Sequence, residues 1–284
     1  MSKTAIITDS DSSLPGETAA EYGIIQVPIR IHFKDSSFES GVNIDDGLLF
    51  KKIAKEKFFP STSAPCPEDF NKAFKNAFAQ GAEHIVCICV SNLVSSTYQS
   101  ALTASENFPD HKIKVIDSLN MSMGQGFMVM AAAEAAANGA SIEEITTEVE
   151  RTGKNVHTLA LLSTLKYLAL SGRVDKFVAN LANTFNIKPI LTVCNGKLDL
   201  LAKIRTHQKA MDKLYALLNQ ITDNKKIERM AIIHVNDLQK AVEMEAHLWN
   251  TVACPEKIVI AEFSPGLSVH TGPGVVGVIV QTAA

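Results

Sequence analysis

The sequence predicts an α/β protein in two domains. Residues 1–155 are expected to form a three-layer α/β/α domain with a mostly parallel sheet, and residues 156–284 a two-layer α/β domain with a mixed sheet. The chain has 284 residues, which is long for a single hydrophobic core. Apolar runs and helical segments alternate through the first half, as in a doubly wound sheet. In the second half, Asn195-Gly196 lies between two strand-like runs and predicts an antiparallel hairpin.

The first half is organised around residues 85–101. The unbroken apolar run 85–90 is typical of a strand buried on both faces. A hydroxyl-rich loop follows, in which Ser96 and Gln99 fit a capping box and predict a helix from about Thr97. A strand, a hydroxyl-rich loop and a helix start direct N–H groups and hydroxyls to one point, where an anion could bind. The alternative is that these hydroxyls only cap the helix.

The other elements follow from periodicity and from turn residues. In the first half we expect strands at 4–8, 26–32 and 112–116, and helices at 45–56, 68–80, 121–138 and from Ser141 onward. Pro28 indicates an edge or a bulge, and residues 61–67 read as a loop stiffened by prolines. In the second half we expect strands at 157–162, 190–193, 197–204, 230–234, 257–262 and 275–281, and helices at 164–169, 206–221 and 238–249.

Composition excludes several classes of function. The chain has 27 Lys and Arg against 30 Asp and Glu, one Trp and four Tyr, so neither charge nor aromatic content favours nucleic acid. The start enters a strand directly, and the most apolar helix, 121–137, is too short to span a bilayer. Five cysteines in mostly apolar runs, with no complete zinc pattern, read as core thiols in a reducing compartment. We therefore expect a cytoplasmic protein without a metal site.

Common catalytic and nucleotide-binding motifs are absent or incomplete. Residues 272–277 match G-x-G-x-x-G, but Pro273 has no N–H and a strand-like run follows where a helix is required. No G-x-S-x-G, H-E-x-x-H or P-loop pattern occurs. His270 stands among glycines and prolines, where a loop could present it to a site.

Several weak motifs gain weight from their order along the chain. They are T-D-S at 8–10, T-S-x-P at 62–65, V-S-S-T-Y-Q-S-A at 94–101, D-S followed by S-M-G-x-G at 117–126, T-L-x-Y-L with G-R at 164–173, K-P-I at 188–190 and H-x-G-P-G-x-x-G at 270–277. Together they resemble the DegV family, which includes fatty-acid-binding subunits of bacterial fatty acid kinases. Two departures stand out: Ser96 occupies the place of a family glycine, and Ser171 that of the first glycine of G-G-R.

The resemblance implies a long-chain fatty acid, such as palmitate, stearate or oleate, in an apolar tunnel between the two domains. Its carboxylate would meet Thr62 and Ser95, with Ser63 and Ser96 beside them and His270 reaching in from the other domain. Two residues, Arg173 and Ser118, would lie behind this layer, and Arg205 matches a basic position that family members use toward the kinase. No other cofactor is implied, and lipid exchange is compatible with peripheral membrane contact.

The leading hypothesis is therefore a carrier that presents the carboxylate to a separate ATP-dependent kinase and catalyses nothing by itself. A small-molecule hydrolase, with Ser95 as nucleophile and His270 as base, is the alternative. A third reading is a relative that binds some other amphiphile or anion.

Overall fold

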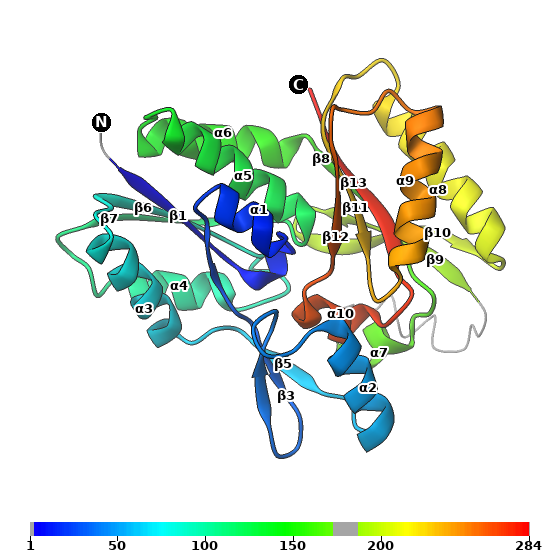
Figure 1. Cartoon of the computed structure of the whole chain (residues 1–284), viewed down its shortest axis with the longest axis horizontal. Helices are drawn as coiled ribbons and strands as arrows, with labels where there is room; N and C mark the ends of the chain where they lie inside the picture. The colour runs from blue at the N-terminus through cyan, green and yellow to red at the C-terminus, as the bar shows by residue number, and fades with distance from the viewer. Residues whose placement is uncertain (1–2, 173–186, 284) are drawn as a thin grey trace.

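The computed structural model describes residues 3–172 and 187–283. In the N-terminal part, four parallel strands form a sheet in the order β2-β1-β6-β7 (Figure 1). The strands are β1 (Thr4–Asp9), β2 (Ile25–Val27), β6 (His84–Cys89) and β7 (Lys112–Asp117). One face packs on α3 (Pro67–Ala79) and α4 (Thr97–Ser105), and the other on α1 (Gly16–Glu21), α5 (Met123–Ala137) and α6 (Ile142–Lys154). The predicted parallel sheet with helices on both faces is confirmed.

A small three-stranded sheet departs from the prediction. Residues 26–32 were expected to form one strand, but the chain leaves the parallel sheet after β2 and pairs again as β3 (Arg30–His32). Pro28 lies at this break, where it has no N–H to donate to a ladder. β3 pairs antiparallel with β4 (Ser37–Glu39) and β5 (Ser61–Ser63), so the expected loop at 61–67 begins as a strand. Helix α2 (Asp46–Glu56) connects β4 to β5.

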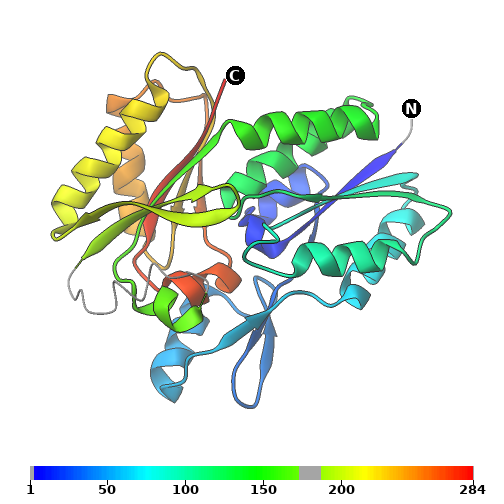
Figure 2. The same cartoon turned by 180° about the vertical axis from the view of Figure 1, so that it is seen from behind.

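The C-terminal part is a six-stranded sheet in the order β10-β9-β8-β13-β11-β12, and the predicted mixed sheet is confirmed. The strands are β8 (Val156–Leu161), β9 (Lys188–Cys194), β10 (Lys197–Ile204), β11 (Ile227–His234), β12 (Ile258–Glu262) and β13 (Val276–Thr282). Asn195 and Gly196 both have positive φ, 47° and 79°, and close the predicted antiparallel β9–β10 hairpin. Helices α8 (His207–Thr222) and α9 (Leu238–Thr251) cover the outer face (Figures 1 and 2).

Helix α5 lies between the two sheets. Its residues Met123 to Ala133 are all buried, because one side packs on the parallel sheet and the other on the inner face of the mixed sheet. The chain passes from α6 to β8 at Asn155, and the division into domains there stays a prediction. Within residues 3–172 and 187–283, no helix combines the length and the apolar character needed to cross a membrane.

Helix α10 (Pro265–Thr271) follows β12 and is tied to the N-terminal part by polar bonds. Ser264 Oγ donates to Asp11 Oδ1 at 2.6 Å, and Ser268 Oγ donates to Asp46 Oδ2 at 2.9 Å. The Gly266 N–H donates to Ser40 Oγ at 3.1 Å. The expectation that a loop holds His270 is wrong, because His270 lies in the last turn of this helix. Pro265 at the first helical position and the Ser264 hydroxyl, which accepts from the Leu267 N–H, start it.

The carboxyl of Asp46 gives a pH-dependent prediction. Burial raises its pKa to about 8, while the Ser268 bond lowers it and the charges of Glu262 and Asp45 raise it further. The unfolded chain releases this proton near pH 4, whereas the folded protein keeps it until about pH 8. The contribution of the protonated Asp46 carboxyl to the free energy of unfolding therefore falls as pH rises from about 4 to 8. Asp46→Asn should remove that loss, and the variant should gain stability relative to wild type as pH rises from about 4 to 8. Urea unfolding at these pH values measures it.

Asp110→Asn is the control for this substitution, because Asp110 is exposed and its charge is not among those that act on Asp46. A difference in unfolding free energy between wild type and Asp46→Asn that stays constant with pH would contradict the role assigned to Asp46.

Candidate functional site

A cavity of about 340 Å³ lies between the two sheets and the small sheet. Most of its wall is apolar and comes from the C-terminal part: Ala160, Leu162, Leu168, Leu191, Val193, Leu198, Phe263 and Leu267. Five of the predicted carboxylate ligands are also on the wall: Thr62, Ser63, Ser95, Ser96 and His270. The described wall residues include no Lys or Arg. The cavity therefore has a large aliphatic surface, and its polar groups include the five predicted residues with one imidazole among them.

Thr62 and His270 meet in this cavity although 208 residues separate them. Thr62 Oγ1 and His270 Nε2 are 2.9 Å apart. Strand β5 fixes Thr62, since it pairs with Ile31 of β3, and helix α10 fixes His270. The bonds from α10 to Asp11 and Asp46 hold the imidazole in place. A hydroxyl and an imidazole on rigid elements can both donate to a carboxylate.

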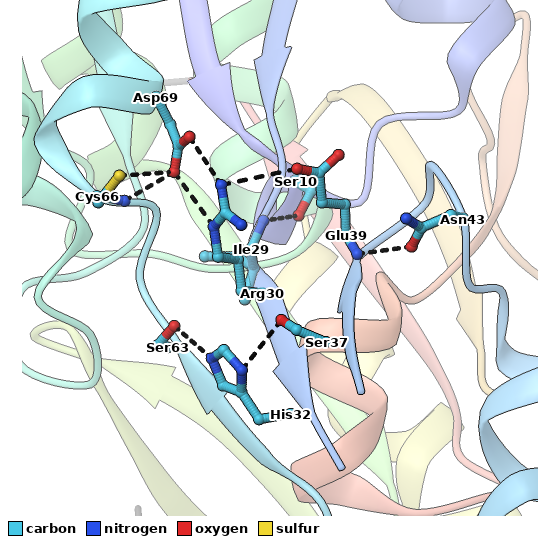
Figure 3. Close-up of polar contacts among 10 residues, drawn as sticks. All are labelled: Ser10, Ile29, Arg30, His32, Ser37, Glu39, Asn43, Ser63, Cys66 and Asp69. Atoms are coloured by element: carbon cyan, nitrogen blue, oxygen red, sulfur yellow. Dashed lines mark hydrogen bonds and ion pairs between the residues drawn. The ribbon is translucent and has the colours of Figure 1, made fainter. Parts of the chain in front are cut away.

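Ser63 faces another group. Successive side chains of a strand point to opposite faces, so Thr62 meets His270 while the Ser63 hydroxyl lies 2.8 Å from His32 Nε2 (Figure 3). His32 Nδ1 is in turn 3.1 Å from Ser37 Oγ. In this arrangement Ser63 lines the cavity, but its hydroxyl is engaged with the half-buried His32.

An ion pair anchors the loop that follows β5. The Arg30 guanidinium donates to Asp69 at 2.8 Å, and Asp69 also accepts from the Cys66 N–H at 2.9 Å (Figure 3). Partial burial would raise the pKa of Asp69, but the bonds from Arg30 and Cys66 outweigh it and lower the pKa. The charged carboxylate caps α3 and steadies the chain around Thr62.

The hydroxyls before α4 bond differently from the predicted capping box. Ser96 has φ −83° and ψ 10°, which is not the extended backbone of an N-cap, and its side chain makes no cap bond. Instead Ser95 Oγ accepts from the Thr97 N–H at 3.3 Å and lies 2.8 Å from Thr97 Oγ1. Ser95 is therefore the hydroxyl that orders this turn, while Ser96 is exposed at the cavity rim.

The remaining predicted residues lie away from the cavity wall or outside the description. Ser118 is buried and donates to the Asn120 carbonyl at 3.0 Å, so it shapes the loop before α5. Arg205 is exposed between β10 and α8. Arg173 lies outside the described residues.

Asp11, Ser122 and Thr158 are among the polar wall residues that sequence reasoning missed. Asp11 lies in a serine-rich acidic run and Ser122 in the S-M-G motif, so both had a sequence signal. For Thr158 the only sequence signal was the alternation of side chains along its strand. That alternation does not show which residues of other elements lie opposite Thr158.

Comparison with known proteins decides the family. The model for "Uncharacterised protein, DegV family" matches residues 3–283. The chain belongs to the DegV family. DegV domain-containing proteins of Caldanaerobacter subterraneus and Clostridium acetobutylicum are 30% and 31% identical to it, over 99% and 98% of this chain and 99% and 97% of theirs.

Solved DegV structures have the same fold. A DegV family protein from Thermus thermophilus, described as binding fatty acid, superposes with a TM-score of 0.91 at 28% identity, over 99% of this chain and 100% of that one. DegV from Bacillus subtilis, described as a fatty acid binding protein, has a TM-score of 0.89 at 25% identity, with 100% of both chains covered. A DegV protein from Ruminococcus gnavus, described with vaccenic acid, has a TM-score of 0.86 at 25% identity, over 99% and 100%.

The bonds in this member of the DegV family bear on the hydrolase hypothesis. A serine nucleophile needs a base within hydrogen-bond reach. Ser95 Oγ is bonded to Thr97, and His270 Nε2 to Thr62. Within the described parts of the chain, no three His, Cys, Asp or Glu residues gather to hold a metal ion. In these bonds Ser95 and His270 are each paired with a threonine.

The turn before α4 gives a paired prediction. Ser95→Ala should lower the free energy of unfolding by about 0.5–2 kcal/mol, because it removes the side-chain acceptor of the first N–H of α4. Ser96→Ala should leave the unfolding free energy within about 0.5 kcal/mol of wild type, as for other surface changes. Urea denaturation of both variants measures the difference. Equal losses of unfolding free energy in the two variants would support the capping box predicted at Ser96.

Proposed function

We propose that this protein binds one long-chain fatty acid in the cavity between its two domains and presents the carboxylate to a partner enzyme. The observation that carries the proposal is the Thr62–His270 pair, 2.9 Å apart, on the wall of a cavity with a large aliphatic surface. Ser95 contributes a second hydroxyl from the loop before α4. The protein itself catalyses no step and needs no cofactor or metal.

The physical chemistry of the cavity fits an acyl chain. Each methylene group removed from water contributes ~0.8 kcal/mol, so a saturated tail of sixteen or eighteen carbons supplies most of the affinity. The carboxylate needs only hydrogen-bond donors, since neutral hydroxyls and N–H groups bind an anion without a buried Lys. Asp11 also lies on the wall, where its carboxyl accepts a hydrogen bond from Ser264 Oγ. It would repel a ligand carboxylate placed beside it.

Relatives support the same ligand class. The Thermus thermophilus and Bacillus subtilis structures are both described as fatty acid binding and cover this whole chain. We propose palmitate, stearate or oleate as the ligand, taken up in the cytoplasm or through transient contact with a membrane surface.

Fatty-acid titration tests the carboxylate site. Thr62→Val keeps the shape of the side chain but removes its hydroxyl, and it should weaken binding by about 1–3 kcal/mol through loss of a bond to a charged group. Ser61→Ala is the control, because Ser61 is exposed on the same strand and is not among the wall residues. Fluorescent fatty-acid displacement and mass spectrometry of gently purified protein give the affinities and the bound lipid.

Equal affinity in wild type, Thr62→Val and His270→Ala would remove this pair from the site. Steady hydrolysis of esters or acyl-CoA that disappears in both Ser95→Ala and His270→Ala would replace the carrier by the hydrolase.

The partner we propose is an ATP-dependent kinase that forms an acyl phosphate. Arg205 is exposed at the start of α8, with Lys209 one turn further on, so this end of the helix presents positive charge outside the cavity. Charge at an interface rim chiefly affects the association rate. Arg205 would therefore serve docking, and the cavity would serve the acyl chain.

Arg205→Ala should leave fatty-acid affinity and thermal stability unchanged and lower acyl phosphate formation with the cognate kinase several-fold at low salt. Lys213→Ala is the control, since it removes the same charge from an exposed site on α8. A wild-type rate in Arg205→Ala at all salt concentrations would make Arg205 an ordinary surface residue.

A further inference from the structure

Two hydroxyls on the cavity wall are buried and have no hydrogen-bond partner in the part of the chain that the structure describes. Ser122 is 2% exposed and Thr158 is 7% exposed, and both line the cavity. Neither Ser122 Oγ nor Thr158 Oγ1 has a partner among residues 3–172 and 187–283. Buried hydroxyls are normally paired, because removal from water without a bond is unfavourable. Two such hydroxyls in one cavity therefore indicate that the cavity has polar groups whose hydrogen bonds are completed by a ligand.

The backbone of Ser122 is held in a conformation that serine rarely adopts. Its φ of 51° and ψ of −150° lie near a region occupied almost only by glycine. The Ser122 N–H donates to the Asp11 carbonyl at 2.7 Å, which fixes the turn. Ser122 is the N-cap residue of the 15-residue helix α5, yet its side chain makes no cap bond. The first N–H groups of such a helix have no partner within the helix, so this end favours an oxygen atom.

Thr158 lies on the cavity side of β8. Leu159 and Leu161 pack with α8 and α9, whereas Ala160 and Leu162 belong to the core around α5, and Thr158 shares their parity. The first turn of α5 reaches the same end of β8, since a Cβ at Gly124 would lie 3.2 Å from Val156. Ser122 and Thr158 thus lie toward the start of β8.

The carboxylate side lies toward the other end of this strand. Ser163 donates to the Gly274 carbonyl at 2.7 Å, which places the chain after β8 beside the segment that follows His270. Thr158 is four residues back from Leu162, or about 13 Å along the strand. A group bound by Thr158 is therefore several carbons away from a carboxylate held by Thr62 and His270.

We propose that Ser122 and Thr158 form a second oxygen site, which selects fatty acids that carry a hydroxyl or keto group in the middle of the chain. This inference rests on the proposed function of the same cavity. A saturated chain would cover both hydroxyls with methylene groups and leave them unpaired. An oxygen substituent can accept from either hydroxyl, and a hydroxyl substituent can also donate to them.

Competition binding with three ligands of one length tests the site: stearic acid, 2-hydroxystearic acid and 10-hydroxystearic acid. Wild type should bind the 10-hydroxy acid about three- to tenfold more tightly than stearic acid, the range expected for one net hydrogen bond. It should show no such preference for the 2-hydroxy acid, whose oxygen lies beside the carboxylate.

Two variants remove the hydroxyls in different ways. Thr158→Val keeps the shape of the side chain, and Ser122→Gly also relieves the backbone strain, so at least one should fold normally. Each should bind stearic acid at least as tightly as wild type and reduce the preference for the 10-hydroxy acid. Thr282→Val is the control, because its hydroxyl is also buried and unpaired in the described structure but is not on the wall.

The outcomes separate this inference from the proposed function. Binding of stearic acid without a preference for the 10-hydroxy acid would overturn the second site and leave the carrier intact. A preference that persists in both Thr158→Val and Ser122→Gly would also overturn it. Failure of all three acids to bind would end both proposals.

Discussion

The burial of helix α5 is the constraint on which the rest of the structure depends. A helix that is apolar on all sides cannot face water on any side, so it needs a covering layer on each. The parallel sheet covers one side of α5 and the mixed sheet covers the other, and residues of both sheets share one core around it. This arrangement brings the two halves of the chain together. It also places the start of α5, with Met121 and Ser122, on the wall of the cavity.

Polar bonds then define the cavity at the side of α10. The hydroxyls of Ser264 and Ser268 donate to the buried carboxyls of Asp11 and Asp46, and both carboxyls belong to the N-terminal part. Helix α10 is only seven residues long and would be marginal alone. These bonds fix the position of α10, and so they also fix the position of His270 in its last turn. The Thr62–His270 contact is therefore a consequence of how α10 is anchored.

A cavity built this way has different physical properties on its two sides. The mixed sheet contributes aliphatic side chains, which favour a hydrocarbon chain through removal of water. The small sheet, the loop before α4 and α10 contribute hydroxyls and an imidazole, which favour an oxygen ligand. No Lys or Arg belongs to the described wall, so the described residues would meet an acidic group through hydrogen bonds. That combination suits an amphiphile with one acidic end.

The sequence alone determined the two large sheets, because their strands are apolar runs bounded by strong local signals. Asn195-Gly196 predicts the turn of a hairpin, and the Ser141–Glu144 capping box predicts the start of a helix. The DegV motifs also pointed to Thr62, Ser95 and His270, all of which line the cavity. Only the tertiary structure decided how those residues bond. The break after Pro28, the pairing of β5 and the helix at His270 depend on partners distant in sequence. The same holds for Ser122 and Thr158, whose unpaired hydroxyls become visible only when both walls of the cavity are present.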